Sequence, residues 1–103
     1  METSRAIVSL SLTAVPVAGE PFDFDLSIEQ PYLETEFVWR CIVTTGQFQT
    51  PLRVAGGDGF QALCLAIDYV RWTFKTFEEG GGRFLCAGDD FSLVEAYHFL
   101  APN

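Results

Sequence analysis

Three features of the sequence contain residue types that could bind a ligand or take part in catalysis: a glycine-rich loop, a row of carboxylates and one histidine. The loop Gly56-Gly57-Asp58-Gly59 precedes a segment with helical periodicity, and a glycine loop at a helix N-terminus can hold a phosphate. It lacks both G-x-G-x-x-G and the Gly-Lys-Ser/Thr ending of nucleotide-binding loops, and the anionic Asp58 occupies the place of a phosphate. We therefore predict that Asp58 caps the helix and that Gln61 completes a capping box.

The carboxylates follow a strand-like alternation. Asp23, Asp25 and Glu29 lie on one face of that pattern, and Glu34 and Glu36 come soon after it. The segment has neither the glycine turn nor the distal glutamate of a calcium-binding loop, so no metal site is predicted. Nothing in it indicates the desolvation that prepares a carboxylate for acid-base catalysis. These five acids are instead predicted to form a solvated surface that can face a basic partner.

His98 is the only histidine, so a Ser/His/Asp or Cys/His arrangement would need it as the base. The adjoining residues contain no serine or cysteine that could serve as the nucleophile. Cys41, Cys64 and Cys86 lie in apolar segments without a C-x-x-C spacing, which predicts buried, reduced thiols and argues against a zinc site. The sequence therefore predicts neither catalytic residues nor a cofactor.

The whole chain, residues 1–103, has the composition of one folded acidic domain, with 49% hydrophobic residues and a formal net charge of −8. This charge repels phosphate backbones and anionic lipids, so no binding to nucleic acid or to a membrane is expected. No apolar stretch has the length of a membrane span, and the N-terminus lacks a secretory pattern. We expect a cytoplasmic protein.

Residue periodicity predicts the elements that position these side chains. Alternation of apolar and polar residues predicts a hairpin of two strands, residues 5–13 and 22–29. A third strand, residues 36–45, is apolar on both sides and is expected at the centre of the sheet. A fourth, residues 47–54, contains Pro51 and is expected at an edge or with a bulge.

The period then changes to about 3.6 residues, which predicts a helix over residues 60–77 that ends at Gly80-Gly81-Gly82. The predicted core stripe of this helix contains Phe60, Leu63, Cys64, Ile67, Val70, Phe74 and Phe77. A short strand at 83–87 and a turn at 88–90 follow, and residues 91–100 form either a strand or a helical turn. The order β-β-β-β-α-β predicts a two-layer α+β fold, an antiparallel sheet with one main helix packed on one face.

The predicted helix has more apolar surface than one contact with a sheet requires. Leu65, Tyr69 and Trp72 fall on a flank roughly opposite part of the core stripe. Three occupants can cover this flank: the chain after Phe91, a second copy of the protein, or a different protein that uses the tyrosine and the tryptophan as anchors.

Residues 54–67, together with Trp39-Arg40-Cys41, resemble an uncharacterised family of small bacterial proteins. The family has an aromatic-Arg-Cys strand and a helix start of the form Gly-x-Asp-x-x-Gln-Ala-Leu-x-Leu-Ala, which residues 56–66 match. The resemblance covers roughly residues 5–88, and residues 91–103 depart from the pattern. It implies an α+β layout and a bacterial origin, and it implies no catalytic residue.

These observations favour a small non-enzymatic domain that acts through protein–protein contact. We expect it either to form a homodimer through Leu65, Tyr69 and Trp72 or to bind a basic protein, as an immunity or inhibitor protein binds a toxin or nuclease. The alternative is a small-molecule-binding domain or a minor enzyme. Its pocket would lie between helix and sheet and be lined by Trp39, Phe48, Tyr69 and Trp72.

Overall fold

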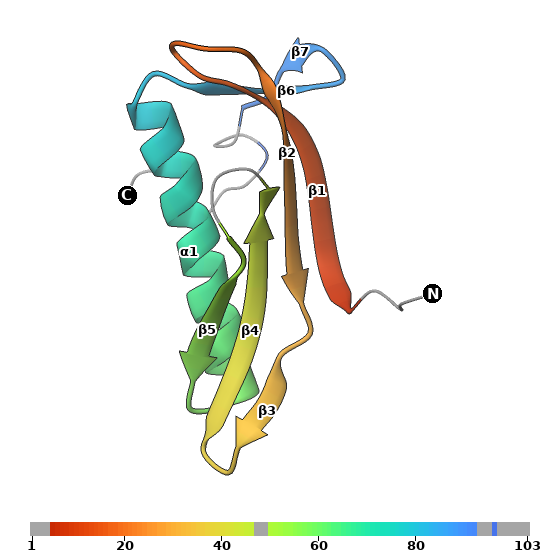
Figure 1. Ribbon diagram of the computed structural model, residues 1–103, viewed down its shortest axis with the longest axis vertical. Coiled ribbons are helices and arrows are strands. Elements are labelled where there is room, and N and C mark those ends of the chain that lie inside the picture. The colour runs from red at the N-terminus through yellow and green to blue at the C-terminus, as the bar shows by residue number, and fades with distance from the viewer. Residues whose placement is uncertain (1–4, 47–49, 93–95, 97–103) are drawn as a thin grey trace.

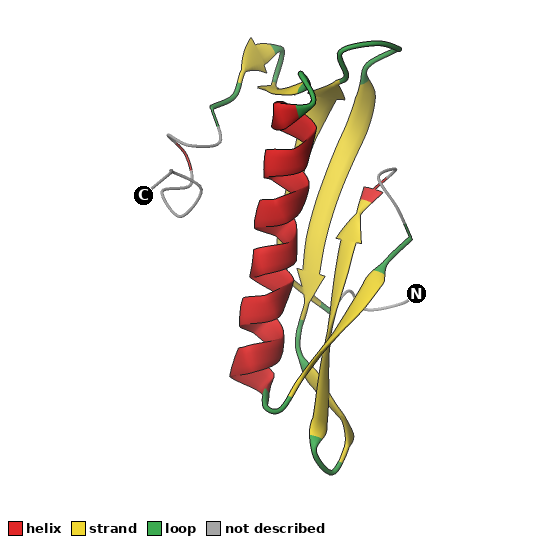
Figure 2. Ribbon diagram, turned by 90° about the vertical axis from the view of Figure 1, so that its left-hand side faces the viewer, coloured by secondary structure: helices red, strands yellow, loops and turns green. Residues whose placement is uncertain are grey.

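The computed structural model describes residues 5–46, residues 50–92 and residue 96. These residues form one antiparallel sheet and one helix that packs on it, which is the α+β arrangement that the sequence predicts (Figure 1). Seen from the side, the helix runs along one face of the sheet (Figure 2). No helix within the described ranges is both long and apolar enough to span a membrane.

Five strands precede the helix: β1 (Ala6–Val15), β2 (Phe22–Glu29), β3 (Tyr32–Thr35), β4 (Val38–Thr45) and β5 (Leu52–Gly56). The helix, α1, spans Gly59–Glu79, and β6 (Arg83–Cys86) and β7 (Asp89–Asp90) follow it. Across the sheet, β7 pairs with β6, β6 with β1, β1 with β2, and β2 with β4. Val43 of β4 pairs with both β2 and β5, so β5 lies on the far side of β4.

The predicted third strand, residues 36–45, is shorter in the structure, and a strand that the sequence analysis missed precedes it. Gln30 and Pro31 lie between two consecutive strands, so that β2 ends at Glu29 and β3 begins at Tyr32. Both β2 and β3 pair with β4, and β5 pairs with its other side. The prediction that this apolar strand is central is therefore confirmed. The turn at Glu36 and Phe37 separates β3 from β4.

The predicted fourth strand is displaced towards the helix. Residues 47–49 lie outside the described residues, and β5 begins only after Pro51, which has no amide hydrogen for a ladder. Within the part of the chain that the structure describes, β5 pairs with β4 alone, so it is an edge strand as predicted.

The prediction of a turn at residues 88–90 was wrong. Asp89 and Asp90 form β7 opposite Cys86 and Leu85, and the turn is made by Ala87 and Gly88, whose φ angles are 53° and 89°. The next residue, Phe91, donates its N–H to the carbonyl oxygen of Phe84 at 3.0 Å. The predicted element at 91–100 lies mostly outside the described residues.

The core lies between α1 and the sheet and is richest in aromatic rings where β6 joins β1. The rings of Phe24, Phe74 and Phe84 are 5.3 to 5.5 Å apart, and the ring of Phe77 lies 4.9 Å from that of Phe84. Phe24, Phe74 and Phe84 are almost fully buried. Aromatic pairs at these separations add to the stabilisation that burial itself provides.

The helix is rotated relative to its predicted core stripe. Its buried residues are Ala62, Ala66, Val70, Thr73 and Phe74. Two residues of the predicted stripe are instead at the surface, since Phe60 is 77% exposed and Ile67 is 37% exposed. Cys64, also predicted in the stripe, is exposed.

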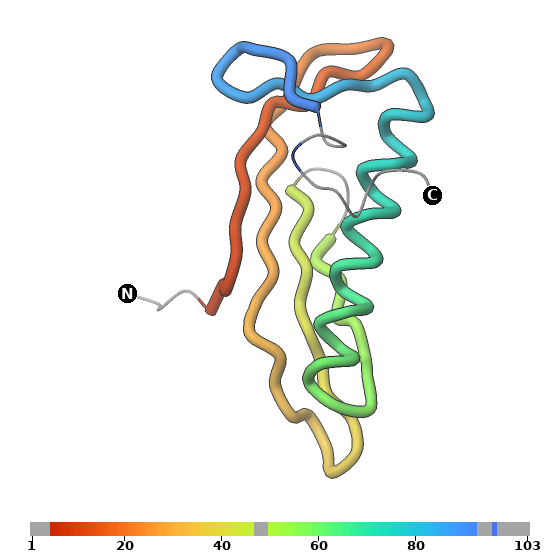
Figure 3. The backbone as a smooth tube through the Cα atoms, turned by 180° about the vertical axis from the view of Figure 1, so that it is seen from behind, coloured from red at the N-terminus to blue at the C-terminus, as the bar shows by residue number. Residues whose placement is uncertain are grey.

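The close approach of β5 to the helix accounts for this rotation. A Cβ atom added to Gly56 would lie 2.6 Å from the backbone nitrogen of Ala62. Two backbones this close require the smallest side chains at the contact, which the helix supplies with its alanines. As a consequence α1 sits over β4 and β5, and β1 lies at the side of the sheet farthest from the helix (Figure 3).

Candidate functional site

An apolar groove lies between α1 and the first two strands. Its volume is about 350 Å³. It is lined by Val8, Ser9 and Leu10 of β1, Leu26 and Ile28 of β2, and Ile67, Val70 and Phe74 of α1. The groove is open to solvent, since Val8 is 52% exposed and Ile67 is 37% exposed, and none of its lining residues carries a charge.

The groove is open because one helix is too narrow for this sheet. An α-helix with its side chains is about 10 Å wide, and neighbouring strands lie about 4.8 Å apart, so one helix covers about two strands. Here α1 contacts β4 and β5, and β2 lies between β4 and β1. The apolar face of β1 near its start therefore has no helix above it.

The same part of β1 also has an open edge. The strand pairs with β2 over most of its length, but it pairs with β6 only at Thr13, Ala14 and Val15. No strand among the described residues pairs with the other side of β1 at residues 7–12. This stretch contains neither a charged residue nor a proline, which proteins commonly use to block an edge. A register shift next to Ile7 is its one irregularity.

A polar hollow lies on the opposite face of the sheet, beside the same edge. Its volume is about 270 Å³. It lies at the end of the open edge where β6 begins, and it is lined by Ser11, Leu12 and Thr13 of β1, Asp23 and Asp25 of β2, Leu85 of β6 and the turn residue Ala87. The hydroxyl of Ser11 donates a hydrogen bond of 2.8 Å to Oδ1 of Asp25, which holds this carboxylate towards β1. The apolar groove and the acidic hollow thus lie on opposite faces of β1, the groove beside residues 8–10 and the hollow beside residues 11–13.

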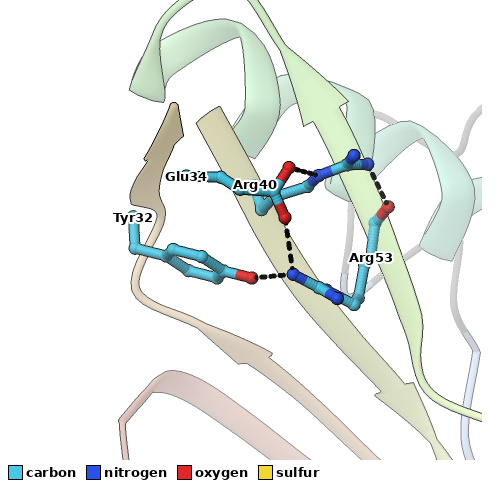
Figure 4. A network of polar contacts seen from close by, with 4 residues as sticks. All are labelled: Tyr32, Glu34, Arg40 and Arg53. Carbon is cyan, nitrogen blue, oxygen red and sulfur yellow. Dashed lines mark hydrogen bonds and ion pairs between the residues drawn. The ribbon is translucent and has the colours of Figure 1, made fainter. Parts of the chain in front are cut away.

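The five predicted partner-facing acids do not form one surface. Asp23 and Asp25 come together at the hollow, and Glu29 lies farther along the same face of β2, partly buried. Glu36 lies in the turn between β3 and β4. Glu34 belongs to a separate network on the sheet (Figure 4).

That network neutralises Glu34 with the protein's own arginines. Arg40 Nε donates to Glu34 Oε2 at 2.9 Å, and Arg53 Nη2 donates to Glu34 Oε1 at 2.7 Å and to the hydroxyl of Tyr32 at 2.6 Å (Figure 4). The hydrogen bond from Arg40 is the main reason why the pKa of Glu34 is lowered. The network joins β3, β4 and β5, so its role is to hold these strands together.

The predicted interface residues lie on the flank of α1 away from the groove. The rings of Tyr69 and Trp72 stack with their centres 5.9 Å apart and an angle of 26° between their planes. Trp72 is 60% exposed and Leu65 is 41% exposed, whereas Tyr69 packs partly against the core. This flank is a second apolar surface, separate from the groove.

The predicted lining of an aromatic pocket is wrong. Trp39 packs at the start of the helix, since a Cβ atom on Gly59 would lie 3.3 Å from its ring. Trp72 comes about three and a half turns later, or roughly 20 Å along the helix axis, so Trp39 and Trp72 cannot line one pocket. Phe48 lies outside the described residues. The groove beside β1, which the sequence analysis missed, is lined by aliphatic side chains and Phe74.

Asp58 and Gln61 serve the helix N-terminus. The amide of Gln61 donates to Oδ1 of Asp58 at 2.7 Å, and Oε1 of Gln61 accepts from the amide of Gly57 at 2.6 Å. The side chain of Gln61 therefore bonds one residue before the cap, not to the cap itself as in a capping box. Both side chains satisfy amides that have no partner within the helix.

The three thiols differ in their surroundings. Cys41 is buried and donates to the carbonyl oxygen of Glu29 at 3.4 Å, and burial raises its pKa. Cys64 and Cys86 are exposed, which contradicts the prediction that all three are buried. In the ranges that the structure describes, no three His, Cys, Asp or Glu side chains are placed to hold a metal ion, and His98 lies outside them.

Comparisons with family models, with curated proteins and with solved structures found no match to this chain.

Proposed function

We propose that the protein is a non-enzymatic domain that acts by binding another protein at the groove between α1 and β1. The observation that carries this proposal is the open apolar lining, with Val8 and Ile67 exposed to solvent beside an unpaired strand edge. Exposed apolar surfaces of this kind mark interaction sites in soluble proteins. The lining offers no titratable group for acid-base chemistry, which favours binding over catalysis.

The partner we propose is a basic protein. The net charge of −8 speeds encounter with such a protein and disfavours acidic competitors. An immunity or inhibitor protein that covers a basic toxin or nuclease has these properties. We also propose a cytoplasmic location, because three free cysteines, two of them exposed, suit a reducing compartment.

Two substitutions on opposite flanks of the helix test the site. Ile67 and Leu65 are aliphatic and similarly exposed, at 37% and 41%, but only Ile67 lines the groove. Ile67→Glu places a charge in the apolar lining and is expected to weaken partner binding about tenfold or more, because a buried, unpaired charge is costly. Leu65→Glu is the matched control and is expected to leave binding within about twofold.

The measurement is the Kd of each variant for a purified partner, after the partner has been identified by its retention on the immobilised wild-type protein. Loss of binding in Leu65→Glu together with full binding in Ile67→Glu would move the interface to the other flank. Circular dichroism melts of both variants establish that they are folded.

Self-association on the Leu65, Tyr69 and Trp72 flank is a second candidate, favoured by the stacked and exposed Tyr69–Trp72 pair. Aromatic pairs of this kind act as anchors in interfaces. Light scattering over a concentration series distinguishes a monomer of 11.4 kDa from a dimer. Trp72→Glu is expected to convert a dimer to the monomer, and a mass of 11.4 kDa in the wild type at every concentration would exclude this candidate.

Binding of an apolar small molecule in the groove is a third candidate, because a volume of about 350 Å³ falls in the range of ligand pockets. A thermal-shift screen with medium-chain fatty acids tests it. The expected result is stabilisation of the wild type and none of Ile67→Glu, and the absence of any shift in the wild type would count against this candidate.

A further inference from the structure

We propose that the segment bound at this site is an extended strand in which apolar and basic residues alternate, and that it pairs with residues 7–12 of β1. Its apolar side chains enter the groove and its basic side chains lie on the opposite face, where those next to β6 reach the hollow that holds Asp23 and Asp25. This inference rests on the proposed function, because it names the kind of partner that the groove receives.

The backbone of β1 supplies the first part of the argument. Between residues 7 and 12, no strand of the described chain pairs with the side of β1 opposite β2. Alternate N–H and C=O groups along such an edge lack sheet partners, so an extended segment can add to the sheet through backbone hydrogen bonds. This mode of recognition gives affinity through the main chain and specificity through the pockets on either face.

The two faces beside this edge supply the second part. Side chains along a strand point alternately to opposite faces of the sheet, and an added strand lies about 4.8 Å from its neighbour. On one face the added side chains meet the groove, with Val8 and Leu10 of β1 and Ile67 of α1 in its lining. On the other face, the side chains at the end of the added strand next to β6 meet the hollow at Ser11 and Asp25, since β6 itself lies beside Thr13. A segment in which apolar and basic residues alternate therefore fits both faces of the sheet.

The charge in the hollow supplies the third part. Neither Asp23 nor Asp25 forms an ion pair with a basic residue of the described chain. Two strand spacings separate β2 from the added strand, about 10 Å, and lysine and arginine side chains can extend across most of that distance. The hydrogen bond from Ser11 already holds the Asp25 carboxylate towards this edge.

The same charges disfavour two other occupants. A second copy paired through residues 7–12 of its own β1 would bring no lysine or arginine to the hollow, since that stretch contains neither. The C-terminal residues 93–103 contain no lysine or arginine to face the hollow. A basic segment from another protein complements both faces.

Two synthetic peptides of identical composition test the alternation. One is an acetylated, amidated octapeptide in which lysine and valine alternate, and the other has four lysines followed by four valines. Because both carry the same net charge, an attraction set by net charge alone binds them equally. We expect the alternating peptide to bind at least about tenfold more tightly, measured by calorimetry at matched salt. Equal affinities would overturn the proposal.

Variants of the protein assign the two faces. Asp23→Asn combined with Asp25→Asn is expected to weaken binding of the alternating peptide about fivefold, as exposed ion pairs of modest strength are lost. Ile67→Glu is expected to weaken it about tenfold or more. Asp68→Asn, which removes an exposed acid from the outer surface of the helix, is the matched control and leaves the affinity within about twofold. A loss in Asp68→Asn as large as in the double variant would contradict the assigned face.

Amide hydrogen exchange tests the strand pairing itself. Addition of a strand is expected to slow exchange at alternate amides of residues 7–12, since only every second amide points to the edge. Uniform or absent protection with bound peptide would overturn the proposal. Protection of these amides already present without peptide would also overturn the proposal. If that protection is lost when residues 93–103 are removed, those residues are the occupant. If that protection increases with protein concentration, a second copy of the protein is the occupant.

Failure of this inference differs from failure of the proposed function. If neither peptide binds and Ile67→Glu still abolishes binding of the natural partner, the groove is the site and its occupant is not an alternating strand. If Ile67→Glu retains the natural partner, the groove is not the binding site.

Discussion

The two ends of β1 have the same alternation of residues and opposite surroundings. Ala14, near the end of the strand, is flanked by β2 and β6 and is fully buried, whereas Val8, near its start, is flanked by β2 alone and is half-exposed. Both residues lie on the helix side of the sheet. The burial of an apolar strand residue therefore depends on the neighbouring strand and on the helix above it, not on the alternation alone.

The same contrast extends to the interactions that stabilise each end. At the end where β6 joins the sheet, which we term the aromatic end, Phe24, Phe74 and Phe84 pack in van der Waals contact. At the other end, where β3 and the start of α1 lie, exposed polar contacts predominate: the Glu34 network and the helix cap (Figure 1). We term this the polar end. Burial of aromatic rings stabilises more than exposed ion pairs do, so the two ends should differ in their sensitivity to substitution.

The largest effect is expected at the aromatic end. Phe84→Ala removes a buried ring and leaves a cavity, and we expect the free energy of unfolding to fall by about 3–5 kcal/mol. Val8→Ala, at the open part of β1, is the control and should lower it by less than about 1 kcal/mol, because the side chain is half-exposed. Urea denaturation measures both. Equal losses would show that the open part of β1 is covered in solution.

The junction of β5 and α1 should give the next largest effect. Gly56→Ala forces a methyl group against the backbone of Ala62, and we expect a loss of about 1–3 kcal/mol as the helix moves away from β5. At the adjacent glycine, Gly57→Ala meets only the flexible end of Gln61 and should cost less than about 1 kcal/mol. If the two variants unfold at the same urea concentration, the close approach does not set the position of the helix.

A smaller effect is expected at the polar end from the helix cap. Asp58→Ala removes the acceptor for the amide of Gln61 and should lower the free energy of unfolding by about 1 kcal/mol. Asp58→Ser keeps a side-chain oxygen at the cap and should recover most of this loss. Thermal melts of the two variants give the comparison, and a serine variant no more stable than the alanine variant would contradict the capping role.

The smallest effect is expected from Glu34 and depends on pH. Because Arg40 lowers the pKa of Glu34 in the folded state, its ion pairs stabilise the protein above the ordinary value of 4.5, and this contribution is lost as the pH falls through the lowered pKa. The stability difference between wild type and Glu34→Gln should therefore be present at neutral pH and disappear as the pH falls below 4.5 and through the lowered pKa of Glu34. Melting temperatures across this range measure it. A difference that persists unchanged in acid would show that the network acts through packing instead of charge.

Periodicity predicted most of the elements and could not predict which side chains they bury. The alternation in residues 22–29 and the change of period before the helix are local signals, and the structure contains β2 and α1 at these places. The predicted core stripe of the helix was correct for Val70 and Phe74, and Leu63 and Phe77 pack against the core. It was wrong for Phe60, Cys64 and Ile67, because the stripe was chosen by hydrophobicity, whereas the contact with Gly56 favours the alanines. The short strands β3 and β7 were missed because β3 follows Pro31 and ends in polar residues, and because the two residues of β7, Asp89 and Asp90, carry no periodicity.

The candidate site was less predictable than the fold. The acids on β2 were identified from the sequence, but only the structure places Asp23 and Asp25 in a hollow and pairs Glu34 with two arginines. The groove brings together side chains from β1, β2 and α1 that are up to 66 residues apart in the chain, from Val8 to Phe74, and a single sequence contains no signal for such a combination.

Local interactions were sufficient to specify the helix, its cap, its glycine terminus and the alternating strands, because each depends on residues within a few positions of one another. The open groove and the unpaired edge of β1 were decided by the tertiary structure. They exist because one helix about 10 Å wide is held over β4 and β5 by the contact at Gly56, and because β6 is too short to cover the first half of β1. The contact at Gly56 is local, but the span of the sheet beside one helix and the pairing of Thr13 with Leu85 join parts of the chain that meet only once it has folded.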